Sequence, residues 1–340
     1  MNLFKFVALF LTLVLLQGTV LCAEDHGDIP VNKILLLDDF DSASELNLLG
    51  GKTQGDEEFP GGCIPSFVSD PSITFGRNGQ SLKLDYDVLD PNSFSYYWSK
   101  TGSGGAQAGS STHLDLTPYR YLSFWIKSSE VAPRFQVEFH QDKDNDKFFV
   151  QGKDVVGKIP VTRFLTDKTV ENWRKIVIPF TSFKQIEDWS KILEIVFVFE
   201  NKNQSKKGTL YVDDILFGSV DTQNPNLLEP IEKKDVFGYF EVNGTNSEGD
   251  TFPLKPRNDL ELVLKVTPKH LERVHFDISM DGGKTWKTLK NFYNHVQGEG
   301  YRFQWMLQPG ETAGEVLLRA CVSNFTGQTT VVAGPLKGKV

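Results

Sequence analysis

The feature that most constrains this chain is an alternation of apolar and polar residues with a period of two. It is clear in segments 82–87, 122–127, 135–140 and 175–180. In each segment the apolar residues fall on one face of an extended strand and the polar residues on the other. No amphipathic stretch with a helical period reaches three turns. The sequence therefore predicts an all-β protein whose strands each bury one face.

Residues 32–218 carry enough strand signals for a complete sandwich. Besides the alternating segments, residues 34–40, 195–199 and 210–217 are almost continuously apolar. Such runs are typical of strands in the middle of a sandwich. We therefore expect one domain over residues 32–218.

The composition changes after Gly218. Segment 219–235 contains Pro225, Pro230 and a short charge cluster, which is typical of a linker. About seven short strands are expected in residues 236–340, which predicts a smaller immunoglobulin-like β-sandwich. Each half is expected to fold by itself. The expected strands are 237–242, 260–266, 274–279, 286–292, 301–307, 316–322 and 329–333.

Residues 1–23 have the layout of a secretory signal peptide. Lys5 precedes an apolar run over residues 6–16 that is too short to span a bilayer as a permanent helix. Leu21 stands where a bacterial lipobox needs a small residue before Cys22, which argues against a lipoprotein. We expect a secreted, periplasmic or cell-surface protein with no transmembrane segment after signal removal.

Charge and cysteine content exclude several classes of function. The chain has 36 Lys and Arg against 44 Asp and Glu, a net charge of −8, so no basic footprint points to nucleic acid. Three cysteines exclude a disulfide scaffold and a multi-cysteine metal site. The sequence leaves open whether Cys63 and Cys321 form a bridge. No catalytic motif nominates a nucleophile or a metal-binding His pair, so we expect no enzyme.

Two acidic clusters lie at opposite ends of the first predicted domain, in residues 37–41 and 211–215. If the terminal strands lie side by side, several carboxylates converge and repel one another. A hard cation with oxygen ligands, such as Ca²⁺, would resolve that conflict. The alternative is that these residues are solvated strand ends.

Four motifs in the same half resemble those of a family 11 carbohydrate-binding module, a galactose-binding-like jelly roll. The resemblance covers about residues 32–218 and implies a non-catalytic domain that binds β-glucans on a concave sheet face. It also implies a structural Ca²⁺, with Asp39 and Asp213 as the first ligands and Asp41 and Asp214 as further ones. The motifs are Leu37-Asp-Asp-Phe-Asp41, Leu114-Asp-Leu-Thr-Pro-Tyr119, Trp173-Arg-Lys-Ile-Val-Ile-Pro-Phe180 and Tyr211-Val-Asp-Asp-Ile215.

Candidate sugar ligands follow from the phase of each strand, because the apolar phase must face the core. A large aromatic residue in the outward phase is then a candidate for stacking on a sugar ring. Trp125 is one, unless a loop or the second domain covers it. On the strand with Tyr97 the outward phase is either that of Tyr97 or that of Tyr96 and Trp98. The predicted ligand-binding residues are Asp85, Tyr97, Trp125, Glu138 and His140.

These features favour a secreted, non-catalytic carbohydrate-binding protein that recognises a β-glucan or a related polysaccharide or oligosaccharide. An alternative is an extracellular scaffold or adhesion protein whose jelly roll binds another protein. A third is a glycoside hydrolase or lyase with an unrecognised site.

Overall fold

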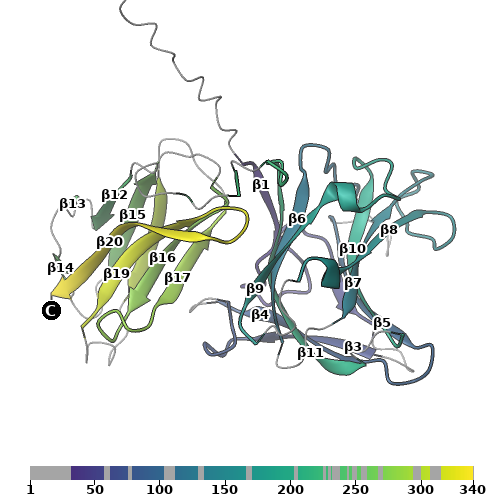
Figure 1. Cartoon of the computed structure of the whole chain (residues 1–340), viewed down its shortest axis with the longest axis horizontal. Coiled ribbons are helices and arrows are strands. Elements are labelled where there is room, and N and C mark those ends of the chain that lie inside the picture. The colour runs from purple at the N-terminus through teal and green to yellow at the C-terminus, as the bar shows by residue number, and fades with distance from the viewer. Residues whose placement is uncertain are drawn as a thin grey trace, which may run out of the picture. The chain divides into compact units, whose positions relative to one another are not determined.

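The structure described is a computed structural model of the chain (Figure 1). Residues 1–31, which include the predicted signal peptide, lie outside the described residues, as does about half of segment 219–235. Among the residues described, no helix is long and apolar enough to cross a membrane. The structure describes residues 32–56, 62–75, 79–102, 112–128, 134–165, 171–202, 206–224, 227–228, 231, 238–242, 245–246, 251–253, 259–266, 271–293, 300–306 and 315–339.

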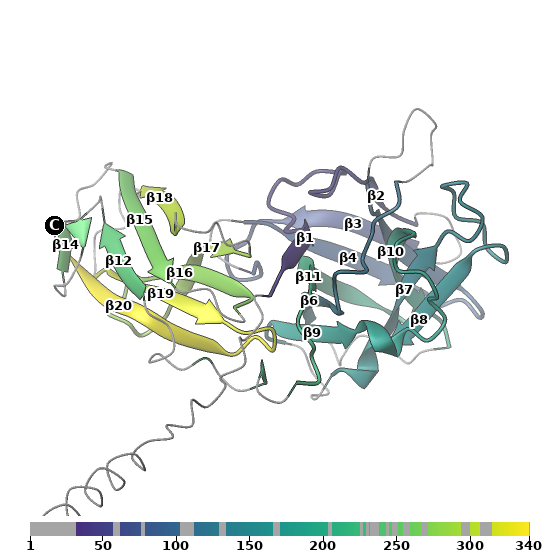
Figure 2. The ribbon, with the colours of Figure 1, turned by 90° about the horizontal axis from the view of Figure 1, so that it is seen from above.

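The first β-sandwich consists of two sheets that face each other across a common core (Figure 2). Its first sheet, called sheet A, has six strands in the order β3-β4-β11-β6-β9, with β1 paired to β11. All its neighbouring strands are antiparallel. The strands are β1 (Ile34–Asp38), β3 (Gly62–Val68), β4 (Ser81–Asp87), β6 (Tyr121–Ser128), β9 (Arg174–Pro179) and β11 (Lys207–Gly218).

The second sheet, called sheet C, has five antiparallel strands in the order β2-β5-β10-β7-β8. Two single 3-10 turns, η1 (Val161–Arg163) and η2 (Phe180–Ser182), follow β8 and β9. The expected all-β architecture is confirmed. The strands are β2 (Thr53–Gly55), β5 (Phe94–Lys100), β7 (Phe135–Gln141), β8 (Val155–Pro160) and β10 (Ile192–Glu200).

The core between the two sheets is formed by the apolar phases that the alternation predicts. Leu84 of β4 and Phe124 of β6 come from sheet A, and Phe139 of β7 and Phe197 of β10 from sheet C; all four are buried in one cluster. Phe124 and Phe197 bring their ring centroids within 5.1 Å. Because these phases point inward, the intervening residues of each strand form the two outer faces of the sandwich.

The first and last strands of this sandwich lie side by side, as the calcium hypothesis requires. β1 pairs antiparallel with β11, with Leu36 opposite Leu216 and Asp38 opposite Ile215. The ladder is irregular between Leu36 and Asp38. This pairing brings the two acidic clusters to one place.

The second sandwich contains a four-stranded sheet in the order β13-β12-β15-β18 and a five-stranded sheet in the order β14-β20-β19-β16-β17. All seven expected strands are present, together with two short ones, β13 and β14. The immunoglobulin-like character of this half and its independent folding stay predictions. The strands are β12 (Gly238–Val242), β13 (Thr245–Asn246), β14 (Thr251–Pro253), β15 (Asp259–Val266), β16 (Arg273–Ser279), β17 (Lys287–Phe292), β18 (Tyr301–Met306), β19 (Leu317–Ser323) and β20 (Thr329–Lys339).

A buried polar contact connects the two sandwiches. Lys175 of β9 forms an ion pair with Glu272, and their side chains are only 5% and 1% exposed. The Tyr121 hydroxyl donates to the other Glu272 oxygen at 2.8 Å. An apolar cluster that includes Leu216 and Phe325 adjoins this pair. Burial and the nearby charge of Arg273 hold the pKa of Lys175 well below its usual range, and the charge of Asp214 opposes this shift.

Candidate functional site

The outer face of sheet C carries a row of aromatic side chains along β5. The buried residues of this strand are Ser95, Tyr97 and Ser99, so the opposite phase faces outward. That phase holds Phe94, which is 55% exposed, and the half-buried Tyr96 and Trp98. The Phe94 and Tyr96 rings lie 6.2 Å apart at 19°. Three rings two residues apart make an extended apolar strip, because residues on one strand face repeat about every 7 Å.

Polar side chains continue this face across the neighbouring strands. Trp98 lies opposite Val196 of β10, and Val196 lies opposite Glu138 of β7. In the row beside it, Tyr96 is followed by Val198 and Gln136 in the same way. The two valines are at most 9% exposed. The face therefore combines an aromatic strip, an apolar floor and a polar border, which we call the sheet C platform.

His140 lies at one end of the platform between two carboxylates. Its Nδ1 is 2.7 Å from Glu194 Oε1, and its Nε2 is 3.3 Å from Glu138 Oε2. The Phe149 ring stacks on the imidazole at 3.7 Å. Burial alone would lower the pKa of His140, but the hydrogen bonds and charges of both glutamates raise it above its usual value. The imidazole thus joins β7 to β10 through its contacts with both glutamates.

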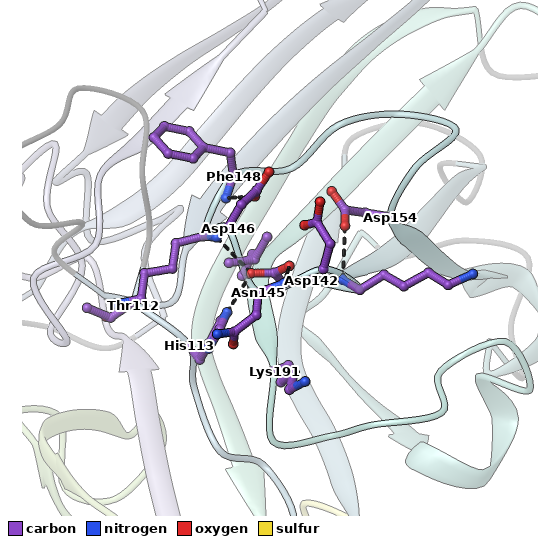
Figure 3. A network of polar contacts seen from close by, with 12 residues as sticks. Thr112, His113, Asp142, Asn145, Asp146, Phe148, Asp154 and Lys191 are labelled. Atoms are coloured by element: carbon purple, nitrogen blue, oxygen red, sulfur yellow. Dashed lines mark hydrogen bonds and ion pairs between the residues drawn. The ribbon is translucent and has the colours of Figure 1, made fainter.

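The loop that carries Phe149 is fixed by two buried carboxylates (Figure 3). Asp142 accepts hydrogen bonds from the Asn145 amide at 2.6 Å and the Lys147 amide at 2.8 Å, and contacts His113 Nε2 at 2.7 Å. Burial alone would raise the pKa of Asp142, but these partners lower it below its usual value. Asp154 accepts from the amides of Lys143 and Val150 at 2.9 and 2.7 Å. The β7–β8 loop is therefore a preformed wall beside the platform.

The structure divides the predicted ligand-binding residues among three places. Glu138 and His140 lie on the sheet C platform. Asp85 lies on sheet A, where it accepts hydrogen bonds from Thr209 and Lys83 at 2.6 Å each. Tyr97 is 3% exposed in the core, and its predicted outward orientation is wrong. The alternative phase, that of Tyr96 and Trp98, is the outward one.

Trp125 does point away from the core of sheet A, but it is covered. Phe75 stacks on its ring at 4.4 Å, and the Arg273 guanidinium of the second sandwich lies 5.3 Å from its centre. The Lys175 ammonium is 5.9 Å from the same ring. Trp125 is thus half-buried in a packed contact, which is the cover that the alternative interpretation expected, and its role as a sugar ligand stays a prediction.

The four predicted calcium ligands line one cavity of about 210 Å³. Asp39 and Asp41 follow β1, while Asp213 and Asp214 belong to β11. Residues 288–293 of the second sandwich form its other wall. Within the described part of the chain, no three of these carboxylates bring oxygens within 4.8 Å of one another. The carboxylates converge as predicted without forming a closed ligand shell.

Burial and mutual repulsion dominate the chemistry of this acidic cavity. Burial, with the charge of Asp214, raises the pKa of Asp213 well above its usual value, and burial raises that of Asp214 to about 7. Hydroxyl groups partly compensate: Ser81 donates to Asp213 at 2.5 Å, and Tyr293 donates to Asp214. The Lys290 ammonium lies 3.7 Å from Asp41. The site favours either protons or a cation.

Sequence reasoning missed two groups of potential metal ligands. Asp142, Asp144 and Asp146 bring oxygens within 4.8 Å of one another, a spacing that the Asp-x-Asp-x-Asp pattern signals. The Lys153 ammonium already pairs with Asp144 and Asp146. In the second sandwich, His275, Asp277 and Cys321 are similarly close and fully buried. Asp277 is held there by Arg319 at 2.9 Å. Cys63 and Cys321 are free thiols.

Comparison with known proteins shows what the first sandwich is similar to: carbohydrate-binding modules of the β-sandwich type. Residues 65–219, a little under half of the chain, match the family model described as Carbohydrate binding domain 30. The expected resemblance to a carbohydrate-binding module is thereby confirmed, with family 30 as the matching family model. No curated protein matches the chain.

Several solved structures are similar to the same half. A family 11 carbohydrate-binding module from Clostridium thermocellum, in complex with a β-1,3-1,4-mixed-linked tetrasaccharide, is 20% identical. The match covers 55% of this chain and 96% of the module, with a TM-score of 0.37. A family 30 module from a cellulosomal cellulase of the same organism is 16% identical. It covers 56% of this chain and 99% of the module, with a TM-score of 0.40.

His140 predicts a pH dependence of stability. A histidine whose folded pKa is raised contributes stability that is present below its unfolded pKa, near 6.5, and is lost as the pH rises through the folded value. His140→Gln should therefore flatten the loss of stability on raising the pH above about 6.5. Urea unfolding of both proteins at several pH values measures this. Parallel stability curves would contradict the bridge between Glu138 and Glu194.

Proposed function

We propose that this chain is a secreted, non-catalytic protein that binds a β-glucan or a related polysaccharide on the sheet C platform. The observation that carries the proposal is the row of Phe94, Tyr96 and Trp98 on an outer sheet face. Sugar rings have apolar faces that stack on aromatic side chains, while their hydroxyls need hydrogen-bond partners. A linear chain that follows the strip would meet one ring after another.

The border of the platform supports binding of sugar hydroxyls. Glu194 supplies carboxylate oxygens on β10, the strand next to the aromatic strip, and Gln136 and Glu138 supply amide and carboxylate oxygens on β7, one strand further. The Lys100 ammonium lies 5.5 Å from the centre of the Trp98 ring. Because many of these groups already have protein partners, they are preorganised before a ligand arrives, which lowers the ordering cost of binding.

Trp98→Ala is expected to weaken polysaccharide binding about 10- to 100-fold, the value of about 1.5–3 kcal/mol for covering a large apolar side chain. Affinity gels with mixed-linkage β-glucan, hydroxyethylcellulose, xylan and agarose measure the effect for the mature chain. Tyr211→Ala is the matched control, because Tyr211 is a half-buried aromatic residue of sheet A. If wild type binds a glycan and Trp98→Ala with Phe94→Ala binds it equally well, the platform is not the site. Release of reducing sugar from any of these glycans would contradict the non-catalytic proposal.

We also propose that the acidic cavity holds a structural Ca²⁺. Its donors are four carboxylates, the hard oxygen ligands that this ion prefers. Asp39 and Asp41 would bind from the end of β1, and Asp213 and Asp214 from β11. Burial raises the pKa values of both β11 carboxyl groups, and a cation bound to their oxygens would favour the charged form that burial disfavours. A cation there would stabilise the pairing of the first and last strands.

A further inference from the structure

A second cavity in the first sandwich is lined by none of the aromatic residues of the sheet C platform. Its volume is about 550 Å³, within the range of small-molecule sites of about 300–1,000 Å³. Two segments line it: residues 116–120, which lead into β6, and residues 180–189, which cross from β9 in sheet A to β10 in sheet C. We call it the end groove.

The end groove is built on rigidly packed aromatic residues. The Trp189 ring lies flat against Phe180, with centroids 4.0 Å apart and planes at 4°. Two backbone hydrogen bonds join the lining segments: the Leu116 amide donates to the Trp189 carbonyl, and the Phe180 amide donates to the Arg120 carbonyl, both at 2.8 Å. Trp189 and Tyr119 remain half-buried at the groove. They are therefore fixed apolar surfaces that a ligand can cover without rearranging the segments.

Polar groups surround this aromatic floor, and their charges cancel. Arg120 and Lys184 carry positive charge, and Glu187 and Asp188 carry negative charge. Thr181, which also lines the groove, is an exposed residue and offers a hydroxyl group. A balanced rim favours neither an anion nor a cation, while hydroxyl, carboxylate and guanidinium groups pair well with a ligand rich in hydroxyls. An aromatic floor with a neutral polar rim fits the two faces of a pyranose ring.

From this arrangement we infer that the end groove is a second carbohydrate-binding site, for a neutral mono- or disaccharide unit. The choice of a sugar as the ligand rests on the proposed function, whereas the groove itself is observed in the structure. The two sites differ in shape: the platform presents an open strip along β5, whereas the groove is a cavity between two loops. The groove would therefore take a short sugar or a chain end, and the platform a longer segment.

The test is a titration of the ¹⁵N-labelled mature chain with cellobiose, followed by amide chemical shifts. The inference predicts saturable shifts in residues 116–120 and 181–189 that persist in Trp98→Ala. Thr181→Trp, which places a ring at the exposed rim, should weaken these shifts at least tenfold in apparent affinity and leave shifts in β5 unchanged. Met306→Trp is the matched control, because it adds the same ring at an exposed position of the second sandwich.

The outcomes separate this inference from the proposed function. Shifts in the groove without shifts in β5 support the second site and count against the platform. Shifts in β5 alone overturn the second site and leave the platform intact. If the groove shifts keep the same apparent affinity in Thr181→Trp, the second site is also overturned, because a ring at the rim should block a sugar bound in the groove. An absence of shifts in both regions overturns the second site, while affinity gels with polysaccharides still test the platform.

Discussion

Glu272→Ala is expected to remove about 3–5 kcal/mol of stability, the cost of leaving one partner of a buried ion pair without the other. Lys175 is 5% exposed, so water cannot replace the lost carboxylate while the two sandwiches stay in contact. The amine must either lose its proton, at about 1.4 kcal/mol per pH unit below its usual pKa, or reach water by separation of the sandwiches. The loss of stability in Glu272→Ala therefore cannot exceed the free-energy cost of the cheaper response, deprotonation of Lys175 or separation of the two sandwiches.

Urea unfolding of the full chain measures this loss. Lys175→Met in the Glu272→Ala background removes the unpaired charge and should recover most of the stability, as a double-mutant cycle detects. Arg302→Ala is the control: its pair with Glu261 is exposed, so its removal should change stability by about 0–1 kcal/mol. A Glu272→Ala loss no larger than that of the control would show that Lys175 is solvated.

The same experiment bears on the expected independent folding of the two halves. If the variant shows two unfolding transitions where the wild type shows one, the ion pair couples two separately stable sandwiches. In an isolated first sandwich, Lys175 would meet water instead of Glu272 and carry no such penalty. Separation of the two sandwiches and unfolding of the first sandwich therefore have different effects on the charge of Lys175.

Local sequence patterns predicted the strands well, because a strand can be recognised when every second residue is apolar and faces the core. The inward residues Leu84, Phe124 and Phe139 all lie in the core as expected. On β5 both phases contain aromatic residues, so alternation alone could not choose between Tyr97 and its neighbours Tyr96 and Trp98. The choice depends on which phase of β5 shares the inner face of sheet C with Phe197 of the neighbouring strand β10, a contact distant in sequence.

The site residues show the same division between local and distant causes. The meeting of Asp39 with Asp213 followed from a single topological assumption, that the first and last strands pair. The outward phase of Trp125 was predicted correctly, but strand alternation could not show whether the ring is covered, because its cover comes from the distant residues Phe75 and Arg273. Phe149 was missed because it reaches the platform only through a loop that Asp142 holds in shape.

Calcium at 100 times its Kd is expected to stabilise the chain by about 2.7 kcal/mol, which corresponds to a rise in Tm of about 5–10 °C for a domain of this size. The physical reason is that the ion replaces mutual repulsion among buried carboxylates with attraction. Thermal unfolding in excess Ca²⁺ and in excess chelator measures the difference. Asp213→Ala should abolish it, because this residue is buried at the centre of the cluster.

Two further measurements decide where such an ion binds and by what chemistry. Asp144→Ala is the matched control, because it removes a carboxylate from the other acidic group, next to Lys153; it should keep the full calcium response. Because burial raises the pKa of Asp214 to about 7, ion binding must displace protons near neutral pH, so the affinity should rise with pH. Calorimetry in two buffers of different ionisation enthalpy detects the released protons. Equal Tm values with Ca²⁺ and with chelator, or a response lost in Asp144→Ala and kept in Asp213→Ala, would rule out the cavity between β1 and β11 as the calcium site.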